Sequence, residues 1–181
     1  DPTGERIRRS PFLTLFPASF EAEGEPQPPD IRRFRDREPG PPQPLPTWWA
    51  DDGEKPLVYV TFGSVAGAVP WVAAVYAAAL EALDGLPVRA LLTLGAADPG
   101  VLGAVPANVH VESWVPQADV LAHADAVDCH GGSGSTLGAL GAGKPLVIAP
   151  LFADQPYNGR RVQEVGAGVS VAPDAAATPD S

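Results

Sequence analysis

The stretch Val127–Pro145, "VDCHGGSGSTLGALGAGKP", contains the elements that decide the fold. A strand-like run ends at Cys129, a loop of small residues follows, and the segment from Ser133 has the composition of a short helix. A second strand-like run, "PLVIAP", begins at Pro145. A strand, a helix and a second strand in this order form a βαβ unit, so the stretch predicts two parallel strands joined by a crossover helix.

The same alternation extends on both sides of this stretch. The run "PLVYVTF" is fully apolar and rich in β-branched residues, as expected of a strand buried in a parallel sheet. The sequence therefore predicts an α/β fold, a Rossmann-like parallel sheet with helices on both faces. The strand-like runs cover residues 56–62, 88–94, 108–114, 125–129, 145–150 and 168–171; the helix-like segments cover 70–85, 117–124, 133–143 and 154–166, and 95–106 is a looser connection.

The segment 70–85 has the clearest helical pattern. Pro70 stands at a favourable first position and Gly85 just past the end. Its apolar residues recur at helical spacing and predict a core-facing stripe rather than a cofactor site. The stripe consists of Trp71, Val72, Val75, Tyr76, Ala79, Leu80 and Leu83. Packing is likewise the expected role of Trp48 and Trp49.

Residues 1–55 differ in composition from the rest. Twelve of the 22 prolines lie in residues 1–56, and one strand-like run covers Phe12–Phe16. Residues 21–55 are typical of an extended, proline-rich linker whose arginines are solvated. The folded domain is expected over residues 56–181. The chain contains no methionine, not even at its start, so we expect it to be part of a longer polypeptide.

The composition excludes several classes of function. The formal net charge is −10, and from residue 41 onward five Lys and Arg stand against fourteen Asp and Glu, so the chain is not expected to bind nucleic acid. No apolar run approaches the ~18 residues of a membrane span, and the N-terminus does not resemble a secretory signal. The single cysteine, Cys129, fits a reducing compartment. We therefore expect a cytoplasmic protein.

Residues that could bind a ligand stand directly after several of the strand-like runs. Because the carboxyl ends of parallel strands share one edge of the sheet, where ligands bind, these residues predict a ligand cleft at that edge. They are Gly63-Ser64, Gly95, Trp114, His130 and Asp154-Gln155.

Three familiar glycine motifs nearly fit the loop after Cys129 and are rejected. A phosphate-binding P-loop would need Ser or Thr where Pro145 stands, so Lys144 is expected to be a solvent-facing residue at a helix C-terminus. A Ser-His-Asp hydrolase would need a histidine after the nucleophile, and none follows His130. A dinucleotide fingerprint would need a third glycine where Leu137 stands.

What remains is an anion site next to an aromatic platform. Bare backbone N–H groups and a helix N-terminus favour a phosphate or diphosphate, to which His130, Ser135 or Thr136 can add hydrogen bonds. Trp114 at the same edge suits stacking of a base, and nearby Gln117 suits a base or ribose contact. Asp154 and Gln155 can bind hydroxyl groups, although Asp154 also suits a plain helix cap. Base, diphosphate and hydroxyls together predict a nucleotide sugar.

The residues from Ser113 to Asn158 resemble the donor-binding signature of the GT-B glycosyltransferases related to plant and bacterial UDP-glycosyltransferases. The likeness rests on W-x-P-Q at Trp114–Gln117, HGGSGST at His130–Thr136 and DQ at Asp154-Gln155. It is strongest with the actinobacterial branch that glycosylates antibiotics and other natural products. The resemblance implies the C-terminal half of a GT-B fold, with residues 1–20 as the end of the acceptor domain and 21–55 as the interdomain linker.

The resemblance also implies a role for each residue. The implied substrates are a UDP- or dTDP-sugar and a small-molecule acceptor in an inverting transfer, with no metal or other cofactor. Trp114 would stack on the pyrimidine, the Val115 backbone would pair with it, Gln117 would approach the base or ribose, and Asp154 and Gln155 would hold the sugar hydroxyls. His130 would contact the diphosphate, in a cradle completed by Ser64, Gly132, Ser133, Ser135 and Thr136.

The chain departs from the family pattern in two ways. Gly138 stands where many relatives have a glutamate that holds the ribose hydroxyls, which suggests a donor built on 2′-deoxyribose. The general base of the family, a histidine oriented by an aspartate, belongs to the acceptor domain, so no catalytic base is expected in this chain and the fragment should not turn over alone. Two alternatives stay open, a non-catalytic nucleotide-binding or auxiliary module and a sugar-nucleotide epimerase.

Overall fold

The computed structural model describes residues 4–22, 24, 26–35, 55–65, 69 and 71–171. The chain divides into two compact units, Asp1–Gly40 and Pro41–Ser181. Most of the predicted linker, with Trp48 and Trp49, lies outside the described residues, as do Pro70 and residues 172–181 of the predicted domain.

The first unit is built around a pair of short strands. It contains α1 (Glu5–Arg8), β1 (Phe12–Thr14), the 3-10 turn η1 (Ala18–Phe20) and β2 (Ile31–Arg33). β1 lies inside the predicted strand-like run, and it pairs in parallel with β2, Phe12 opposite Ile31. β2 falls within the residues predicted to be an extended linker, so this part of the segment forms sheet instead. Its Arg33 forms an ion pair with Glu21.

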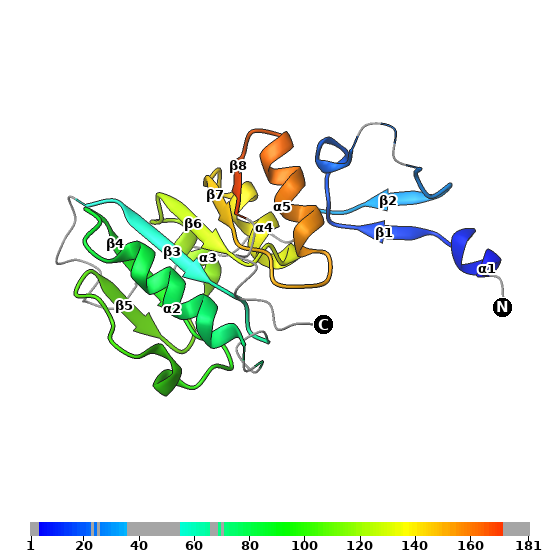
Figure 1. Cartoon of the computed structure of the whole chain (residues 1–181). Coiled ribbons are helices and arrows are strands. Elements are labelled where there is room, and N and C mark those ends of the chain that lie inside the picture. Colours follow the sequence, from blue (N-terminus) through cyan, green and yellow to red (C-terminus); the bar gives the residue numbers. More distant parts are fainter. Residues whose placement is uncertain are drawn as a thin grey trace. The chain divides into compact units, whose positions relative to one another are not determined.

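The second unit is a parallel six-stranded sheet with the strand order β5-β4-β3-β6-β7-β8 (Figure 1). All six predicted strands and all four predicted helices are present, which confirms the α/β fold. The strands are β3 (Leu57–Thr61), β4 (Arg89–Thr93), β5 (Val109–Glu112), β6 (Ala126–Cys129), β7 (Leu146–Ile148) and β8 (Gly168–Ser170). The helices are α2 (Val72–Leu83), α3 (Gln117–Leu121), α4 (Ser133–Gly141) and α5 (Gln155–Glu164), and the looser connection contains the 3-10 turn η4 (Pro99–Leu102).

The core forms on both faces of this sheet. α2 packs its predicted stripe on one face, where the ring of Tyr76 meets that of Phe62 edge-on at 5.2 Å between centroids. The chain runs from β3 to β4 toward one edge of the sheet and from β6 through β7 to β8 toward the other. Because crossovers between parallel strands are right-handed as a rule, α4 and α5 are expected on the face opposite to α2. On that face a Cβ on Gly159 of α5 would lie 3.2 Å from Ile148 Cγ2. Cys129 is fully buried, as predicted for a strand residue.

Candidate functional site

The two central strands define the place where a ligand is expected. From β3 the chain continues to β4 on one side, whereas from β6 it continues to β7 on the other. The loops that leave the carboxyl ends of these neighbouring strands therefore diverge and leave a crevice, the switch point at which α/β sheets bind ligands. The residues that stand there are Gly63 after β3 and His130 after β6.

The imidazole of His130 occupies space that two glycines leave open. A Cβ atom on Gly132 would lie 2.4 Å from His130 Nε2, and a Cβ on Gly63 would lie 2.9 Å from the same atom. Gly63 in turn fits against Gly95, whose Cβ would lie 2.4 Å from the Gly63 carbonyl oxygen. The glycines after three strands thus belong to one packed arrangement, and they seat the ring at the switch point.

The environment of His130 keeps its ring neutral. Burial lowers the pKa of His130, and this outweighs the opposing effects of the Thr61 carbonyl and the Asp154 carboxylate. Its Nδ1 is buried and has no hydrogen-bond partner among the described residues. A neutral imidazole offers one N–H donor, and an anion bound beside it raises its pKa and favours the cation.

The N-terminus of α4 opens beside this ring. Its N-cap residue is Gly132, and no side chain caps the first turn, so backbone N–H groups there face away from the helix without a side-chain partner. Gly131, just before it, has a φ of 84°, which a side chain rarely adopts. Uncapped N–H groups and the helix dipole attract an anion. The combination of this helix end with His130 makes a diphosphate the best fit.

Asp154 faces the same helix end from the start of α5. Its Oδ2 accepts hydrogen bonds from Ser133 Oγ at 2.9 Å and from Asn158 Nδ2 at 3.0 Å. Burial alone would raise the pKa of Asp154, but the hydrogen bonds that it accepts, first from Ser133 and then from Asn158, lower it. The carboxylate is therefore ionised near neutral pH and held in place, as a group that accepts hydrogen bonds from hydroxyls should be.

Gln155 lies in a different position from that expected of a ligand-binding side chain. It is 4% exposed, and its Oε1 accepts hydrogen bonds from the backbone N–H groups of Leu151 and Phe152, at 2.8 and 2.9 Å. These bonds hold the turn that contains Ala153, which has a φ of 57°. Its carbonyl oxygen is thus used inside the protein, and the turn it holds delivers Asp154 to the site.

The predicted base end lies along the edge of β5 and α3. Trp114 follows β5 and is 68% exposed, which is unusual for a tryptophan that only packs, while the side chain of Val115 is buried. Gln117 begins α3, and its Nε2 donates to the Gly134 carbonyl of α4 at 3.3 Å. A Cβ on Gly138 would lie 2.3 Å from that same Nε2, so the Gln117 amide fills the space of a side chain at Gly138.

The remaining predicted cradle residues are spread over the edge. Ser64 is exposed in the loop after β3, and Ser135 is half-buried in the first turn of α4. Thr136 is fully buried, and its hydroxyl has no hydrogen-bond partner among the described residues. The structure thus brings His130, Gly132, Ser133 and Asp154 into one cluster, whereas the Thr136 hydroxyl points into the interior.

Two positions that shape the cluster were not predicted from the sequence. Asn158 joins Asp154 to the glycine loop, and Ala153 adopts the left-handed conformation before Asp154. The spacing of four residues between Asp154 and Asn158 could have indicated the first, because such residues are neighbours on one face of a helix. Nothing in the residue type of Ala153 indicates its conformation.

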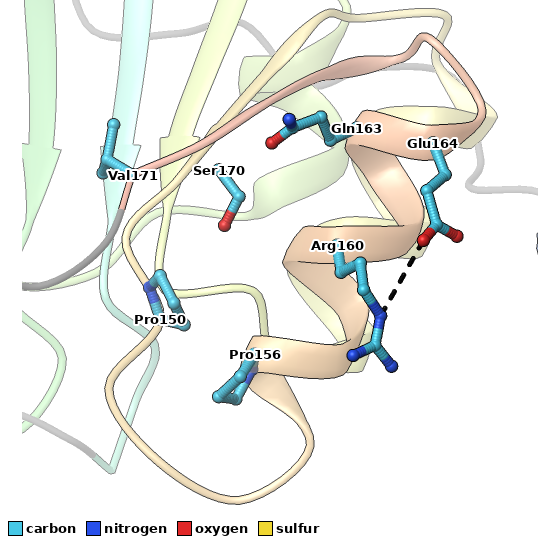
Figure 2. A pocket seen from close by; sticks show the side chains of 7 residues that line it. All are labelled: Pro150, Pro156, Arg160, Gln163, Glu164, Ser170 and Val171. Atoms are coloured by element: carbon cyan, nitrogen blue, oxygen red, sulfur yellow. Dashed lines mark ion pairs between the residues drawn. The ribbon is translucent and has the colours of Figure 1, made fainter.

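A separate groove of about 630 Å³ lies beside α5 and β8 (Figure 2). It shares no residue with the predicted donor site. Its charged residues, Arg160 and Glu164, form an ion pair at 3.9 Å, so the groove offers no net charge to a ligand. Its lining consists of Pro150, Pro156, Arg160, Gln163, Glu164, Ser170 and Val171.

The other two histidines of the described residues, His110 and His123, lie outside the cluster. His110 Nε2 lies 2.9 Å from Glu112 Oε1 on β5, and His123 follows α3. In residues 4–171 as far as the structure describes them, no three His, Cys, Asp or Glu side chains gather as a metal site would require. None of the helices described there combines the length and the apolar character needed to cross a bilayer.

The fold is that of an α/β domain of the GT-B type, and the cluster lies at its β3–β6 switch point. More particularly, the chain belongs to the UDP-glucoronosyl and UDP-glucosyl transferase family, whose model matches residues 31–180. This confirms the family resemblance found in the sequence, and it makes the chain part of a glycosyltransferase family.

Relatives in this family include antibiotic glycosyltransferases of actinobacteria. The elloramycin glycosyltransferase ElmGT of Streptomyces olivaceus is 42% identical over 128 residues, which cover 67% of this chain and 32% of that protein. The structure of the glycosyltransferase SnogD from Streptomyces nogalater superposes with a TM-score of 0.70 at 30% identity, over 88% of this chain and 44% of that one.

A further solved relative contains a nucleotide. The spinosyn rhamnosyltransferase SpnG, complexed with thymidine diphosphate, has a TM-score of 0.66 at 27% identity, over 91% of this chain and 44% of that chain. This chain spans only about a third of the length of curated relatives such as ElmGT, for which the covered share is 32%.

Proposed function

We propose that this chain is the donor-binding half of an inverting glycosyltransferase, which transfers a sugar from a nucleoside diphosphate to a small-molecule natural product. The observation that carries the proposal is the seating of His130 at the switch point, between the glycines of two loops and beside the uncapped N-terminus of α4. Trp114 and Asp154 flank this centre as a base platform and a hydroxyl acceptor. Family membership and the antibiotic glycosyltransferases among the relatives support the reaction class.

The proposed chemistry of this half is stabilisation of the leaving group. When the bond from the sugar to the diphosphate breaks, negative charge grows on the diphosphate oxygens. In this proposal the N–H groups at the start of α4 and a ring N–H of His130 donate hydrogen bonds to those oxygens, and donors held in place by the fold stabilise the charge without rearranging. Asp154 accepts hydrogen bonds from sugar hydroxyls and keeps the sugar oriented during the transfer. No residue of this chain is proposed as the general base.

The proposed donor carries a pyrimidine base on 2′-deoxyribose, as in dTDP-sugars. The Gln117 amide lies over Gly138, where a carboxylate for the ribose 2′-hydroxyl would have to stand. The thymidine diphosphate in the SpnG structure supports the same class of donor. UDP-sugars are the second candidate, since the amide of Gln117 is itself able to bind a hydroxyl group.

Isothermal titration of the chain with dTDP, UDP and ADP tests the proposal. We expect saturable binding of the two pyrimidine nucleotides, with dTDP the tighter, and weaker binding of ADP. His130→Ala should reduce dTDP binding strongly, whereas His123→Ala, a matched change outside the cluster, should leave it unaltered. A folded chain that binds none of the three nucleotides would overturn the proposal for this half.

A further inference from the structure

Asn158 lies at the centre of the cluster although no sequence motif pointed to it. It is 2% exposed and stands on α5 one turn after Asp154. Its Nδ2 donates to the Gly131 carbonyl oxygen at 2.8 Å and to Asp154 Oδ2 at 3.0 Å. A side-chain amide nitrogen carries two hydrogens, so both are used in these bonds.

The two acceptors belong to the two parts of the proposed donor site. Gly131 begins the glycine loop, in a conformation with φ 84° that brings its Cα close to Ile148 and the Gln155 backbone. Asp154 presents its carboxylate at the start of α5, where Ser133 of α4 donates to the same oxygen. A single amide group therefore joins the loop expected to hold phosphate to the carboxylate expected to hold sugar hydroxyls.

A role limited to folding explains only one of these bonds. The Gly131 carbonyl is buried and needs a partner, which Asn158 supplies. Asp154, by contrast, is an exposed residue that water could solvate. Its bond to Asn158 orients the carboxylate without being required to satisfy it.

We propose that Asn158 is a positioning residue that fixes the Asp154 carboxylate relative to the glycine loop, so that the diphosphate and the sugar of one donor are recognised at a set spacing. This inference rests on the proposed function. Preorganised groups act best when hydrogen bonds from neighbouring residues hold them to within a fraction of an ångström. Asn158 provides such support for both ends of the donor at once.

The first test needs no ligand. The pKa of Asp154 is followed by carbon-13 NMR of its carboxyl group in the unmodified chain, in Asn158→Ala and in Asn158→Asp, which keeps the shape of the side chain. Loss of the donated hydrogen bond should raise the pKa of Asp154 in Asn158→Ala, and the added negative charge should raise it further in Asn158→Asp. An unchanged Asp154 pKa in both folded variants overturns the proposal, even if the chain binds no nucleotide at all.

The second test separates phosphate from sugar recognition. The dissociation constants of dTDP and dTDP-glucose are measured by titration calorimetry. We expect Asn158→Ala to weaken dTDP-glucose about tenfold to a hundredfold, which is the scale of one hydrogen bond to a charged group, and dTDP by less. The ratio of the two constants is the informative readout, because general loosening of α5 weakens both ligands together.

Two controls decide between outcomes. Val162→Ala removes buried volume from the same helix away from Asp154, and it should lower the melting temperature without changing the dTDP to dTDP-glucose ratio. In an Asp154→Ala background, Asn158→Ala should no longer change that ratio. Equal weakening of both ligands by Asn158→Ala overturns the positioning role while the proposed function stands. Failure of the unmodified chain to bind either ligand overturns the proposed function. The change in the Asp154 pKa then decides by itself whether Asn158 holds the Asp154 carboxylate.

Discussion

In the half of the sheet formed by β3, β4 and β5, large apolar side chains of α2 pack on the strands. In the half formed by β6, β7 and β8, glycines bring loops and helices close to buried strand residues such as Ile148. In the first half, Phe62, Tyr76 and Leu92 are among the buried residues that α2 and the strands share. In the second half, a Cβ on Gly159 of α5 would lie 2.5 Å from Ser170 Oγ of β8, so helix and strand meet where a side chain is missing.

The difference determines how far stability and function can be separated. The first half keeps its core away from the ligand edge, so Trp114 can change without loss of packing. In the second half, Gly131 and Gly132 both allow close packing and belong to the proposed anion site. Substitutions there should affect folding and binding together.

The largest effect is expected from Gly131→Ala. A Cβ on Gly131 would lie 2.8 Å from Ile148 Cγ2 and 3.1 Å from the Gln155 carbonyl oxygen, and the φ of 84° adds backbone strain. Left-handed strain and overpacking together should cost about 2–5 kcal/mol of unfolding free energy. Urea denaturation measures this loss, and titration calorimetry should show dTDP binding lost with it.

Gly134→Ala is the matched control for this change. Gly134 lies in the first turn of α4, and a Cβ there would meet nothing within 4 Å. Alanine should therefore stabilise the chain by up to ~1 kcal/mol through its higher helix propensity. If Gly131→Ala were as harmless as Gly134→Ala, close packing would not be what holds the second half together.

The second prediction concerns Asp128, a half-buried residue of β6 whose Oδ1 atom is buried. Burial raises the pKa of Asp128 to about 7, and its Oδ1 has no hydrogen-bond partner among the described residues. The folded state thus binds a proton that the unfolded state releases near pH 4, so stability falls as pH rises from about 4 to about 7. Asp128→Asn removes this dependence, which should amount to roughly 2–4 kcal/mol between pH 4.5 and 8.

Chemical denaturation across this pH range measures the effect. The informative quantity is the difference between Asp128→Asn and the unmodified chain, since other carboxyl groups titrate in both. Asp125→Asn, a change at an exposed residue three positions earlier, serves as a control. A constant difference from pH 4.5 to 8 would mean that the Asp128 carboxyl group is solvated and has an ordinary pKa in the folded chain.

Sequence patterns predicted the fold of the second unit nearly completely, and the reasons lie in particular residues. The apolar stripe around Tyr76 indicates a helix that faces the core, and the fully apolar run "PLVYVTF" indicates a buried strand. The pairing of β1 with β2 was not predicted, because Ile31–Arg33 is short and mostly polar and its strand form depends on pairing with Phe12–Thr14 across an intervening loop.

The sequence predicted at which edge of the sheet the site lies, but not which contacts its side chains make. The parallel sheet places His130 and Asp154 at the same edge, so their proximity followed from topology. Whether a polar side chain faces a ligand or the protein depends on neighbours that spacing does not specify. Gln155 and Thr136 illustrate this, since one caps a turn and the other is buried.

The third prediction sharpens the comparison from the first half. Trp114→Ala should weaken dTDP binding by about 1–3 kcal/mol, the contribution of stacking on one base. Because the side chain is 68% exposed, the melting temperature should stay almost unchanged. Trp114→Phe, which keeps an aromatic face, should recover part of the affinity. A large drop in melting temperature in Trp114→Ala would show that the residue packs rather than binds.

The smallest expected effect tests the contact between the two halves, where Gln117 of α3 covers Gly138 of α4. In Gly138→Glu the new side chain displaces the Gln117 amide and places a carboxylate where it can accept a hydrogen bond from a ribose 2′-hydroxyl. One such charged hydrogen bond is worth about 1.5–3 kcal/mol at best, and the displacement of Gln117 offsets part of it. We therefore expect the affinity ratio of UDP to dTDP to rise by about threefold to tenfold. Gly138→Ala displaces the amide without supplying a carboxylate, so it should weaken the binding of both nucleotides and leave the affinity ratio unchanged. If the ratio rose equally in both variants, the Gln117 amide rather than a missing carboxylate would set the preference for dTDP over UDP.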